Sequence, residues 1–186
     1  MLVHFHFGDE YQRYPNQYQK EIVLKTIEFG ADIIIGGHTH VLQPINYFKT
    51  DNARLDTGFV IYSMGNFISN QRWRYSDGGA VITFNLTKDI KNDSVWLKDV
   101  EYLPIWVFKG HTKSGPEYVI LPSESASRDS LYPFLSSADK KEASVSYNDT
   151  KEILTKYISR SRLIEINKIE ITHGNDSALI RNSSIH

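Results

Sequence analysis

Apolar residues that alternate with polar ones, or run together in short stretches, predict a chain built largely from strands. Residues 2–7 alternate, so that Val3, Phe5 and Phe7 share one face of an expected strand. Ile33-Ile34-Ile35 is an unbroken β-branched run that ends at two glycines, which is typical of a buried strand followed by a turn. Further strands are expected over residues 58–63, 79–86 and 95–107, the last with a bend or sheet edge at Pro104.

Between the first two strands the apolar spacing changes to that of an amphipathic helix. The helix is expected from Asn16 or Gln17 to Phe29, with Gly30 as its C-terminal cap. A strand, a helix and a strand within about 35 residues predict a right-handed βαβ crossover with two parallel strands. The carboxyl ends of both strands then open on the same edge of the sheet.

The rest of the chain gives weaker signals. Residues 41–56 are expected to form a loop with a short strand near Tyr47, and residues 111–130 and 136–148 are polar, with helices only in patches. The best later helix covers residues 148–161, where Ile153, Leu154 and Tyr157 form an apolar stripe. Residues 163–171 alternate in their second half like a last strand.

Three histidines lie where the two parallel strands are expected to end. His6 closes the first strand, while His38 and His40 follow the glycines after the second. Neutral imidazole is a common ligand of transition metals, and α/β folds place ligands at strand ends. An H-x-H pair alone is also compatible with a purely structural role. The topology, which brings His6 toward the pair, is the stronger argument for a metal site.

Polar residues next to these histidines have two alternative interpretations each. Asp9 and Glu10 could orient an imidazole N–H or simply solvate a loop. Asn66 follows a glycine at a third strand end, as either a turn residue or a site residue. Arg72 and Arg74 lie in a polar, aromatic stretch that could hold an anionic ligand or form plain surface.

Composition narrows the class of protein. The chain has 186 residues, 40% of them hydrophobic, which is enough for a substantial core. Its net charge of −1, from 21 basic and 22 acidic side chains, argues against nucleic acid or an anionic membrane as the main partner. Cysteine is absent, so that any metal must be bound by nitrogen and oxygen ligands. The first residues lack the features of a signal peptide and read as a core strand, from which we expect further sequence upstream.

Three motifs in register resemble one protein family. They are His6-Phe7-Gly8-Asp9-Glu10-Tyr11, then residues 30–44 with Gly36-Gly37-His38-Thr39-His40, and then Tyr62-Ser63-Met64-Gly65-Asn66-Phe67. Their order and spacing resemble the CapA (PgsA-like) proteins of poly-gamma-glutamate capsule biosynthesis, within the calcineurin-like metallophosphoesterase superfamily. The resemblance covers slightly under half of the chain.

The resemblance implies an α/β fold, namely the C-terminal part of an α/β/β/α sandwich with mixed sheets. Residues 1–110 would be the C-terminal half of the metallophosphoesterase-like domain, and residues 111–186 a variable extension with helices and a last strand. A site for two divalent ions, such as manganese, iron or zinc, would take some of its ligands from His6, His38 and His40. Asp9, Glu10 and Asn66 would orient these ligands or contact substrate, and Arg72 and Arg74 would bind substrate.

Function also follows as an expectation from the resemblance. The complete protein would serve in capsule assembly at the extracellular face of a bacterial cell, as a metal-dependent, phosphoesterase-like hydrolase. The acidic and Asn/His ligand motifs of the family's N-terminal half have no match here, so this chain alone is expected to be inactive. The alternative is a non-catalytic surface component that binds an anionic polymer or partner subunits. Expected partners are an anionic polymer or small phosphate-containing substrate, other capsule-synthesis subunits, and a second copy of the chain.

Overall fold

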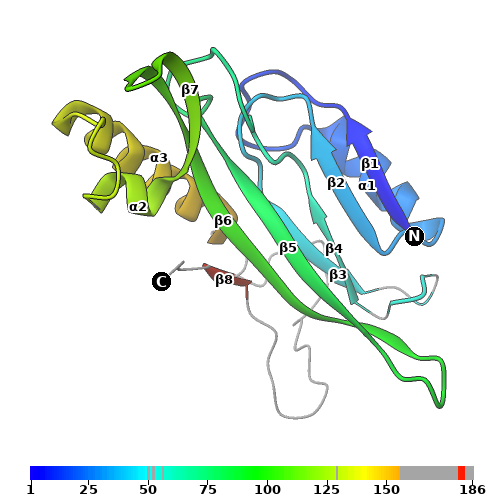
Figure 1. The fold of residues 1–186 in the computed structure, drawn as a ribbon. Coiled ribbons are helices and arrows are strands. Elements are labelled where there is room, and N and C mark those ends of the chain that lie inside the picture. Colours follow the sequence, from blue (N-terminus) through cyan, green and yellow to red (C-terminus); the bar gives the residue numbers. More distant parts are fainter. Residues whose placement is uncertain (50, 52, 56, 129, 156–179, 183–186) are drawn as a thin grey trace.

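The structure is a computed structural model in which residues 1–49, 51, 53–55, 57–128, 130–155 and 180–182 are described. Two sheets lie face to face, with α1 on one side and the α2–α3 pair beside the second sheet (Figure 1). No helix within these described ranges combines the length and apolar character needed to cross a bilayer.

The first sheet has the strand order β1-β2-β4-β3. Its strands are β1 (Leu2–His6), β2 (Ile33–Gly37), β3 (Ile45–Lys49) and β4 (Thr57–Ile61). β1, β2 and β4 run parallel, and β3 is antiparallel to β4. The helix α1 (Gln17–Glu28) connects β1 to β2, so the βαβ crossover predicted from the sequence is confirmed.

The start and end of α1 follow local rules. Asn16 caps the first turn: its side chain accepts a hydrogen bond from the backbone N–H of Gln19, and the Gln19 side chain accepts one from the Asn16 N–H. At the other end Phe29 is the C-cap and Gly30 adopts a φ of +91°, a conformation that glycine reaches without steric cost. The helix therefore ends where the sequence predicted.

The second sheet is formed by long antiparallel strands. They are β5 (Gly78–Lys88), β6 (Val95–Thr112) and β7 (Gly115–Pro122), and the short β8 (Ile180–Asn182) pairs in parallel with β6. Pro104 does not interrupt β6, and of the expected bend or sheet edge the structure shows a local edge. At Pro104 the strand pairs only with β5, because pairing with β7 begins at Ile105 and pairing with β8 ends at Tyr102. The N–H that proline lacks therefore has no partner strand on that side, and no hydrogen bond of the sheet is lost.

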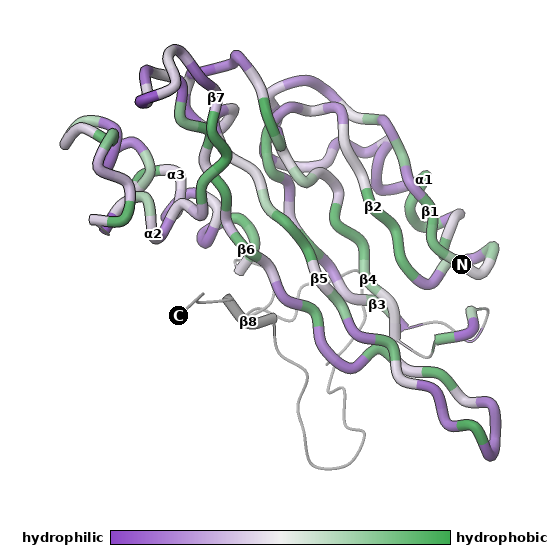
Figure 2. The backbone as a smooth tube through the Cα atoms, in the orientation of Figure 1, coloured by the Kyte–Doolittle hydropathy of each residue, from purple (hydrophilic) through white to green (hydrophobic). Residues whose placement is uncertain are grey.

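Three apolar clusters hold the layers together. The largest lies between the two sheets, with Phe59 of β4 and Val100 of β6 both buried. A second, around Val23 and Ile34, packs α1 against the other face of the first sheet. Hydrophobic segments accordingly run along β2, β4 and β5, whereas the tip of the β6–β7 hairpin is polar (Figure 2). The predicted α/β class is confirmed, with one mixed sheet and a second sheet whose long strands are antiparallel.

The third cluster joins the later helices to the second sheet. α2 (Ser123–Arg128) and α3 (Ser137–Thr155) pack against β6 and β7 around Trp106, which is fully buried. Tyr102 and Trp106 share one face of β6 by strand alternation. Tyr102 packs in the core between the sheets and Trp106 against the helices. The first sheet and the α2–α3 pair thus cover successive parts of the same face of the second sheet.

In the second half of the chain the structure differs from some expectations, and others fall outside the described residues. The helix expected over residues 148–161 begins earlier, at Ser137, and residues 156–161 lie outside the described ranges. In the stretch 111–130, where helices were expected only in patches, the short α2 is such a patch, but the strand β7 was not expected. The division of the chain expected at residue 110 stays a prediction, and β6 runs through this residue. The last strand expected over residues 163–171 also lies outside the described ranges.

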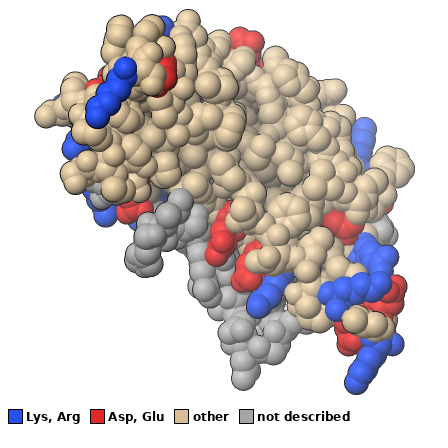
Figure 3. All heavy atoms as spheres, viewed as in Figure 1, with Lys and Arg blue, Asp and Glu red and all other residues tan. Residues whose placement is uncertain are grey.

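Charged side chains are mixed rather than segregated on the face seen in Figure 3. Much of this face carries no charge, and positive and negative groups meet at the tip of the β5–β6 hairpin. There Asp93 forms ion pairs with Lys88 and with Arg54. The view therefore shows no broad basic surface.

Candidate functional site

The carboxyl ends of β1 and β2 bring two of the three histidines into direct contact. His6 is in register with Gly37, so the residue after Gly37 emerges beside it. The Nε2 atom of His6 lies 2.9 Å from Nδ1 of His38, and the two ring centroids are 4.5 Å apart. The parallel crossover thus joins residues that are 32 positions apart in the sequence.

The close approach of β2 to β4 explains one of the glycines before the histidine pair. A Cβ atom built on Gly36 would lie 2.0 Å from the carbonyl oxygen of Tyr62, so no larger residue fits there without a backbone shift.

After the glycines the chain turns, with φ values of +97° at His38 and +61° at His40. These left-handed conformations are uncommon for residues with a side chain. Such strain is found preferentially at functional sites.

His40 is the third member of the cluster and lies beside His38. Its ring centroid is 6.3 Å from that of His38. Its Nδ1 atom lies 3.0 Å from Oδ1 of Asn66, and its Nε2 atom lies 3.8 Å from a carboxylate oxygen of Glu10. Both Asn66 and Glu10 therefore contact the histidine cluster, as two of the polar candidates from the sequence were expected to do.

Tyr11 and Gln71 also belong to this site, although no periodicity or spacing in the sequence pointed to them. The Tyr11 ring stacks on His40 with centroids 5.8 Å apart, and its hydroxyl accepts a hydrogen bond from Gln71. Trp73 meets Tyr11 edge-on and is half exposed. Desolvation and the negative charge of Glu10 raise the pKa of the Tyr11 phenol above its ordinary value, so this hydroxyl stays protonated at neutral pH.

The loop that carries Asp9, Glu10 and Tyr11 is held in place by the side-chain amides of two buried glutamines. Gln19 donates to Gln43 at 2.9 Å, and Gln43 donates to the backbone carbonyl of Gln12 at 2.9 Å. Both glutamine side chains are fully buried. Asp9 accepts a hydrogen bond from Asn16, the cap of α1, and so braces the loop.

Arg72 and Arg74, the expected substrate-binding residues, are both paired with carboxylates of α3. Arg74 donates two hydrogen bonds to Asp149, at 3.0 and 2.9 Å, and these raise the pKa of its guanidinium. Arg72 donates to the backbone carbonyl of Val107 and lies 3.4 Å from Glu142. An anionic ligand would have to compete with these carboxylates for either side chain.

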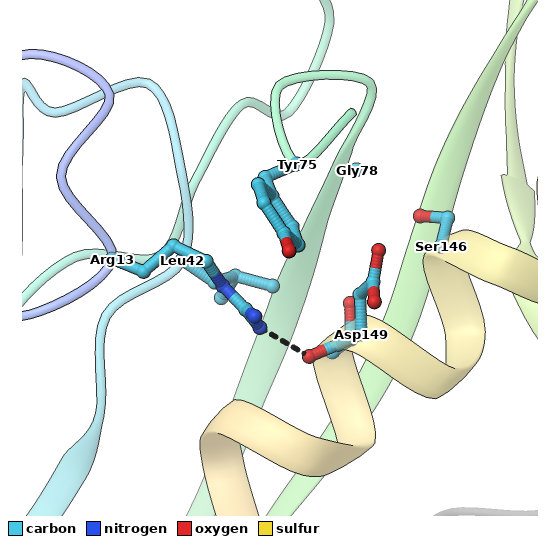
Figure 4. A pocket seen from close by; sticks show the side chains of 7 residues that line it. Arg13, Leu42, Tyr75, Gly78, Ser146 and Asp149 are labelled. Carbon is cyan, nitrogen blue, oxygen red and sulfur yellow. Dashed lines mark hydrogen bonds between the residues drawn. The ribbon is translucent and has the colours of Figure 1, made fainter. Parts of the chain in front are cut away.

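A small pocket lies next to this ion pair, between the 72–78 loop and α3 (Figure 4). Arg13 extends across it, with its guanidinium stacked over Tyr75 at 4.1 Å and donating to the backbone carbonyl of Asp149 at 2.7 Å. The lining residues are Arg13, Leu42, Tyr75, Gly78, Ser146, Asp149 and Thr150. None of the three clustered histidines lines this pocket. The contacts of Arg13 with Tyr75 and Asp149 connect α3 to the loops.

The histidine donors fit part of a metal centre. Two nitrogens bound to one ion at about 2.1 Å, with a right angle between the bonds, lie about 3 Å apart. This matches the 2.9 Å between His6 and His38. Within the described ranges, however, no group of three or more His, Cys, Asp or Glu side chains is placed to hold an ion. This part of the chain supplies fewer ligands than a metal ion needs.

Comparison with known proteins adds the family relationship of this region. Residues 1–71 match the family described as the bacterial capsule synthesis protein PGA_cap. This match includes all three clustered histidines, Asn66 and Gln71.

Two curated relatives each match slightly under half of the chain. The capsule biosynthesis protein CapA of Bacillus anthracis is 34% identical over 86 residues, which are 46% of this chain and 19% of that protein. The PGA biosynthesis protein CapA of Bacillus subtilis (strain 168) is 37% identical over 90 residues, 48% of this chain and 22% of that protein. The matched part of the chain thus spans about a fifth of the length of these curated relatives.

Proposed function

We propose that this chain is part of a CapA-type protein of poly-gamma-glutamate capsule biosynthesis. The observation that supports this most directly is that the capsule-family match, residues 1–71, contains the whole histidine cluster. The names of both relatives refer to capsule or PGA biosynthesis. Capsule assembly is a process of the cell envelope, and we place the chain there, at the extracellular face.

We further propose that His6, His38 and His40 bind divalent metal ions in a metallophosphoesterase-like centre of two ions. The contact between His6 and His38 supports a shared ion, since the distance between their nitrogens suits two neighbouring ligands. Further ligands would come from outside the described residues. When bound, such ions polarise a phosphoryl or carbonyl oxygen and lower the pKa of a bound water. The chain's own part is to orient the three imidazoles.

The substrate in this proposal is an anionic polymer or a small phosphate-containing compound, and other capsule-synthesis subunits are the protein partners. Arg72 and Arg74 remain candidates for contact with an anion at the rim. Each would first have to leave its carboxylate on α3. Poly-gamma-glutamate pull-down with Arg72→Ala and Arg74→Ala, compared with wild type, tests this contact. Retention unchanged by both substitutions excludes the two arginines.

The metal site is tested by titrating the full chain, freed of metal with a chelator, with Zn²⁺ and separately with Mn²⁺ in a calorimeter. His38→Ala should weaken binding at least tenfold, since it removes one of two converging nitrogens. His111→Ala is the matched control, because His111 is exposed on β6, far along the chain from the cluster. Equal binding by wild type and His38→Ala would remove the histidine pair from the site.

The capsule role needs a separate test in the host bacterium. Deletion of the gene should reduce cell-bound poly-gamma-glutamate, and reintroduction of the wild-type gene should restore it. A His38→Ala gene that restores the polymer fully would support the alternative of a non-catalytic surface component. Normal polymer in the deletion strain would contradict the proposed function altogether.

A further inference from the structure

The direction of one hydrogen bond determines where the proton of His40 lies. The side-chain nitrogen of Asn66 donates to the backbone carbonyl of Ser76 at 2.8 Å, and a carbonyl can only accept. The opposite side of the Asn66 amide, its Oδ1 atom, therefore faces Nδ1 of His40 at 3.0 Å. Because this oxygen also can only accept, the Nδ1 atom of His40 carries the hydrogen and Nε2 keeps a lone pair.

Gln71 and Tyr11 extend this hydrogen bond into a closed set of contacts. The Asn66 nitrogen also donates to Oε1 of Gln71 at 2.9 Å, and Nε2 of Gln71 donates to the Tyr11 hydroxyl at 3.1 Å. The Tyr11 ring then returns to His40, stacking on it with an interplanar angle of 24°. The imidazole is thus held at one nitrogen and on one face.

The backbone indicates that this arrangement is under constraint. Tyr11 and His40 have φ values of +63° and +61°, conformations that are unfavourable for residues with a Cβ atom. The Tyr11 N–H donates to the carbonyl of Thr39 at 2.7 Å, which ties the two strained turns together. Thr39 is fully buried, so the connection has little freedom to adjust.

We infer that Asn66, Gln71 and Tyr11 are positioning residues that hold His40 in the Nδ1–H tautomer, with Nε2 bare toward a divalent cation. This inference rests on the proposed metal site for its purpose, but not for its geometry. Nε2 is the nitrogen on the Glu10 side, 3.8 Å from that carboxylate, so the bare lone pair faces a region of negative charge that favours a cation. Hydrogen-bond partners of this kind fix the tautomer of ligating histidines.

The tautomer can be observed without metal. Long-range ¹H–¹⁵N NMR spectra of the full, ¹⁵N-labelled chain are recorded with a chelator at about pH 8, where imidazoles are neutral. His40 should show a protonated Nδ1 and an unprotonated Nε2. The exposed His111 provides the reference for an imidazole in solvent, which prefers the proton on Nε2. A proton on Nε2 of His40 in the wild-type chain would overturn the inference.

Variants test each member of the set. Asn66→Leu should shift the His40 proton to Nε2, and Gln71→Leu should shift part of it. Gln71→Glu, which keeps an acceptor for Asn66, should preserve the Nδ1–H form. Gln17→Leu is the matched control, since Gln17 makes a similar exposed hydrogen bond to Glu21 on α1. Amide chemical-shift dispersion verifies folding, and if Asn66→Leu fails to fold, the two Gln71 variants still decide the outcome.

Affinity for Zn²⁺ gives the second measurement. Gln71→Leu should weaken binding about 10-fold and Asn66→Leu up to about 100-fold, the range found for residues that orient metal ligands. An unchanged tautomer together with unchanged affinity in Gln71→Leu would exclude Gln71 from this role. If the wild-type chain binds no Zn²⁺, the proposed metal site fails, while the NMR result still decides whether the three residues set the tautomer.

Discussion

Single residues at the ends of β1 and β2 decide whether the histidines can meet, and Gly36 is the most constrained of them. A methyl group on Gly36 would overlap the Tyr62 carbonyl, and the β2–β4 pairing leaves the backbone no room to move. Gly36→Ala should therefore lower the free energy of unfolding by about 3 kcal/mol or more. Urea denaturation followed by circular dichroism measures this loss.

Gly37 provides the matched control for this prediction. A Cβ atom there would have His4 as its nearest neighbour, at 3.9 Å, which is an ordinary contact distance. Gly37→Ala should change stability by less than about 1 kcal/mol, because alanine loses less backbone entropy than glycine on folding. Equal losses in the two variants would mean that the close approach of β2 to β4 is not what requires Gly36.

Asp77 is a partly buried carboxylate that contacts the core around Trp106. Its Oδ2 atom accepts a hydrogen bond from the Trp106 indole at 2.9 Å. Burial raises the pKa of Asp77 above its ordinary value, although the Trp106 bond and the charge of Arg72 oppose this shift. Asp77→Ala should cost about 1–3 kcal/mol, because it leaves a buried N–H without an acceptor, whereas Asp77→Asn keeps one.

The raised pKa also sets the direction of a pH effect. The folded state binds the Asp77 proton more tightly than the unfolded state, so this group adds stability as the pH falls from 7 through its folded pKa. Relative to Asp77→Asn, the wild-type chain should therefore gain stability between pH 7 and pH 4, measured by urea denaturation of both proteins at each pH. A difference that moves in the opposite direction would show that Asp77 favours the charged form in the fold.

At the scale of elements, the ion pair between Asp149 and Arg74 connects α3 to the 72–78 loop. Its interaction energy can be measured. Asp149 is largely buried, but Arg74 is 63% exposed, so solvent screens the pair. A double-mutant cycle with Arg74→Ala and Asp149→Ala should give a favourable coupling energy that is larger than that of a single-contact surface pair. Thermal or urea unfolding of the four proteins supplies the values.

The Glu124–Arg128 pair of α2 is a suitable comparison for this cycle. It is a single contact at 3.0 Å between neighbouring turns, with Arg128 67% exposed. Its coupling energy should be about 0.3–0.5 kcal/mol. A coupling at Arg74–Asp149 that is no larger would show that the two-fold hydrogen bonding to Asp149 adds nothing, and Arg74 would then be free to bind an anion.

The sequence predicted the elements whose own residues carry the signal. The β-branched run before Gly36 and the Asn16 cap each act locally, and both β2 and α1 form where expected. The first half of α3 was missed because few of its residues are buried, and two of these, Ala143 and Ser146, are small; Tyr147 is the large one. No apolar stripe marks such a helix in the sequence.

The same distinction applies to the candidate site. The approach of His6 to His38 follows from parallel strand topology, which a single sequence can indicate. The contact of Gln71 with Tyr11 joins residues 60 positions apart through loops, and no repeat or spacing predicts it. The pairing of Arg72 with Glu142 was hidden for a related reason, since Glu142 lies in the part of α3 that the sequence did not predict. The pairing of Arg74 with Asp149 joins residues 75 positions apart, which no spacing predicts.

At the scale of the whole molecule, the histidine cluster lies at one end of an edge strand. β1 pairs with β2 alone among the strands that the structure describes. Its outer row of N–H and C=O groups is therefore a template for another strand. Apolar side chains accompany this edge: Leu2 is 54% exposed, and Phe29, at the end of α1, is 84% exposed.

We therefore predict that the chain associates with itself through the β1 edge at high concentration. Leu2→Lys should weaken association by placing a charge on the edge strand, the device by which natural sheets avoid edge-to-edge pairing. Ile90→Lys is the matched control, since Ile90 is 92% exposed at the β5–β6 hairpin, away from β1. Light scattering across a concentration series measures the apparent mass. A wild-type chain that stays monomeric throughout would contradict the prediction, and equal weakening by both variants would assign association to general surface hydrophobicity rather than to this edge.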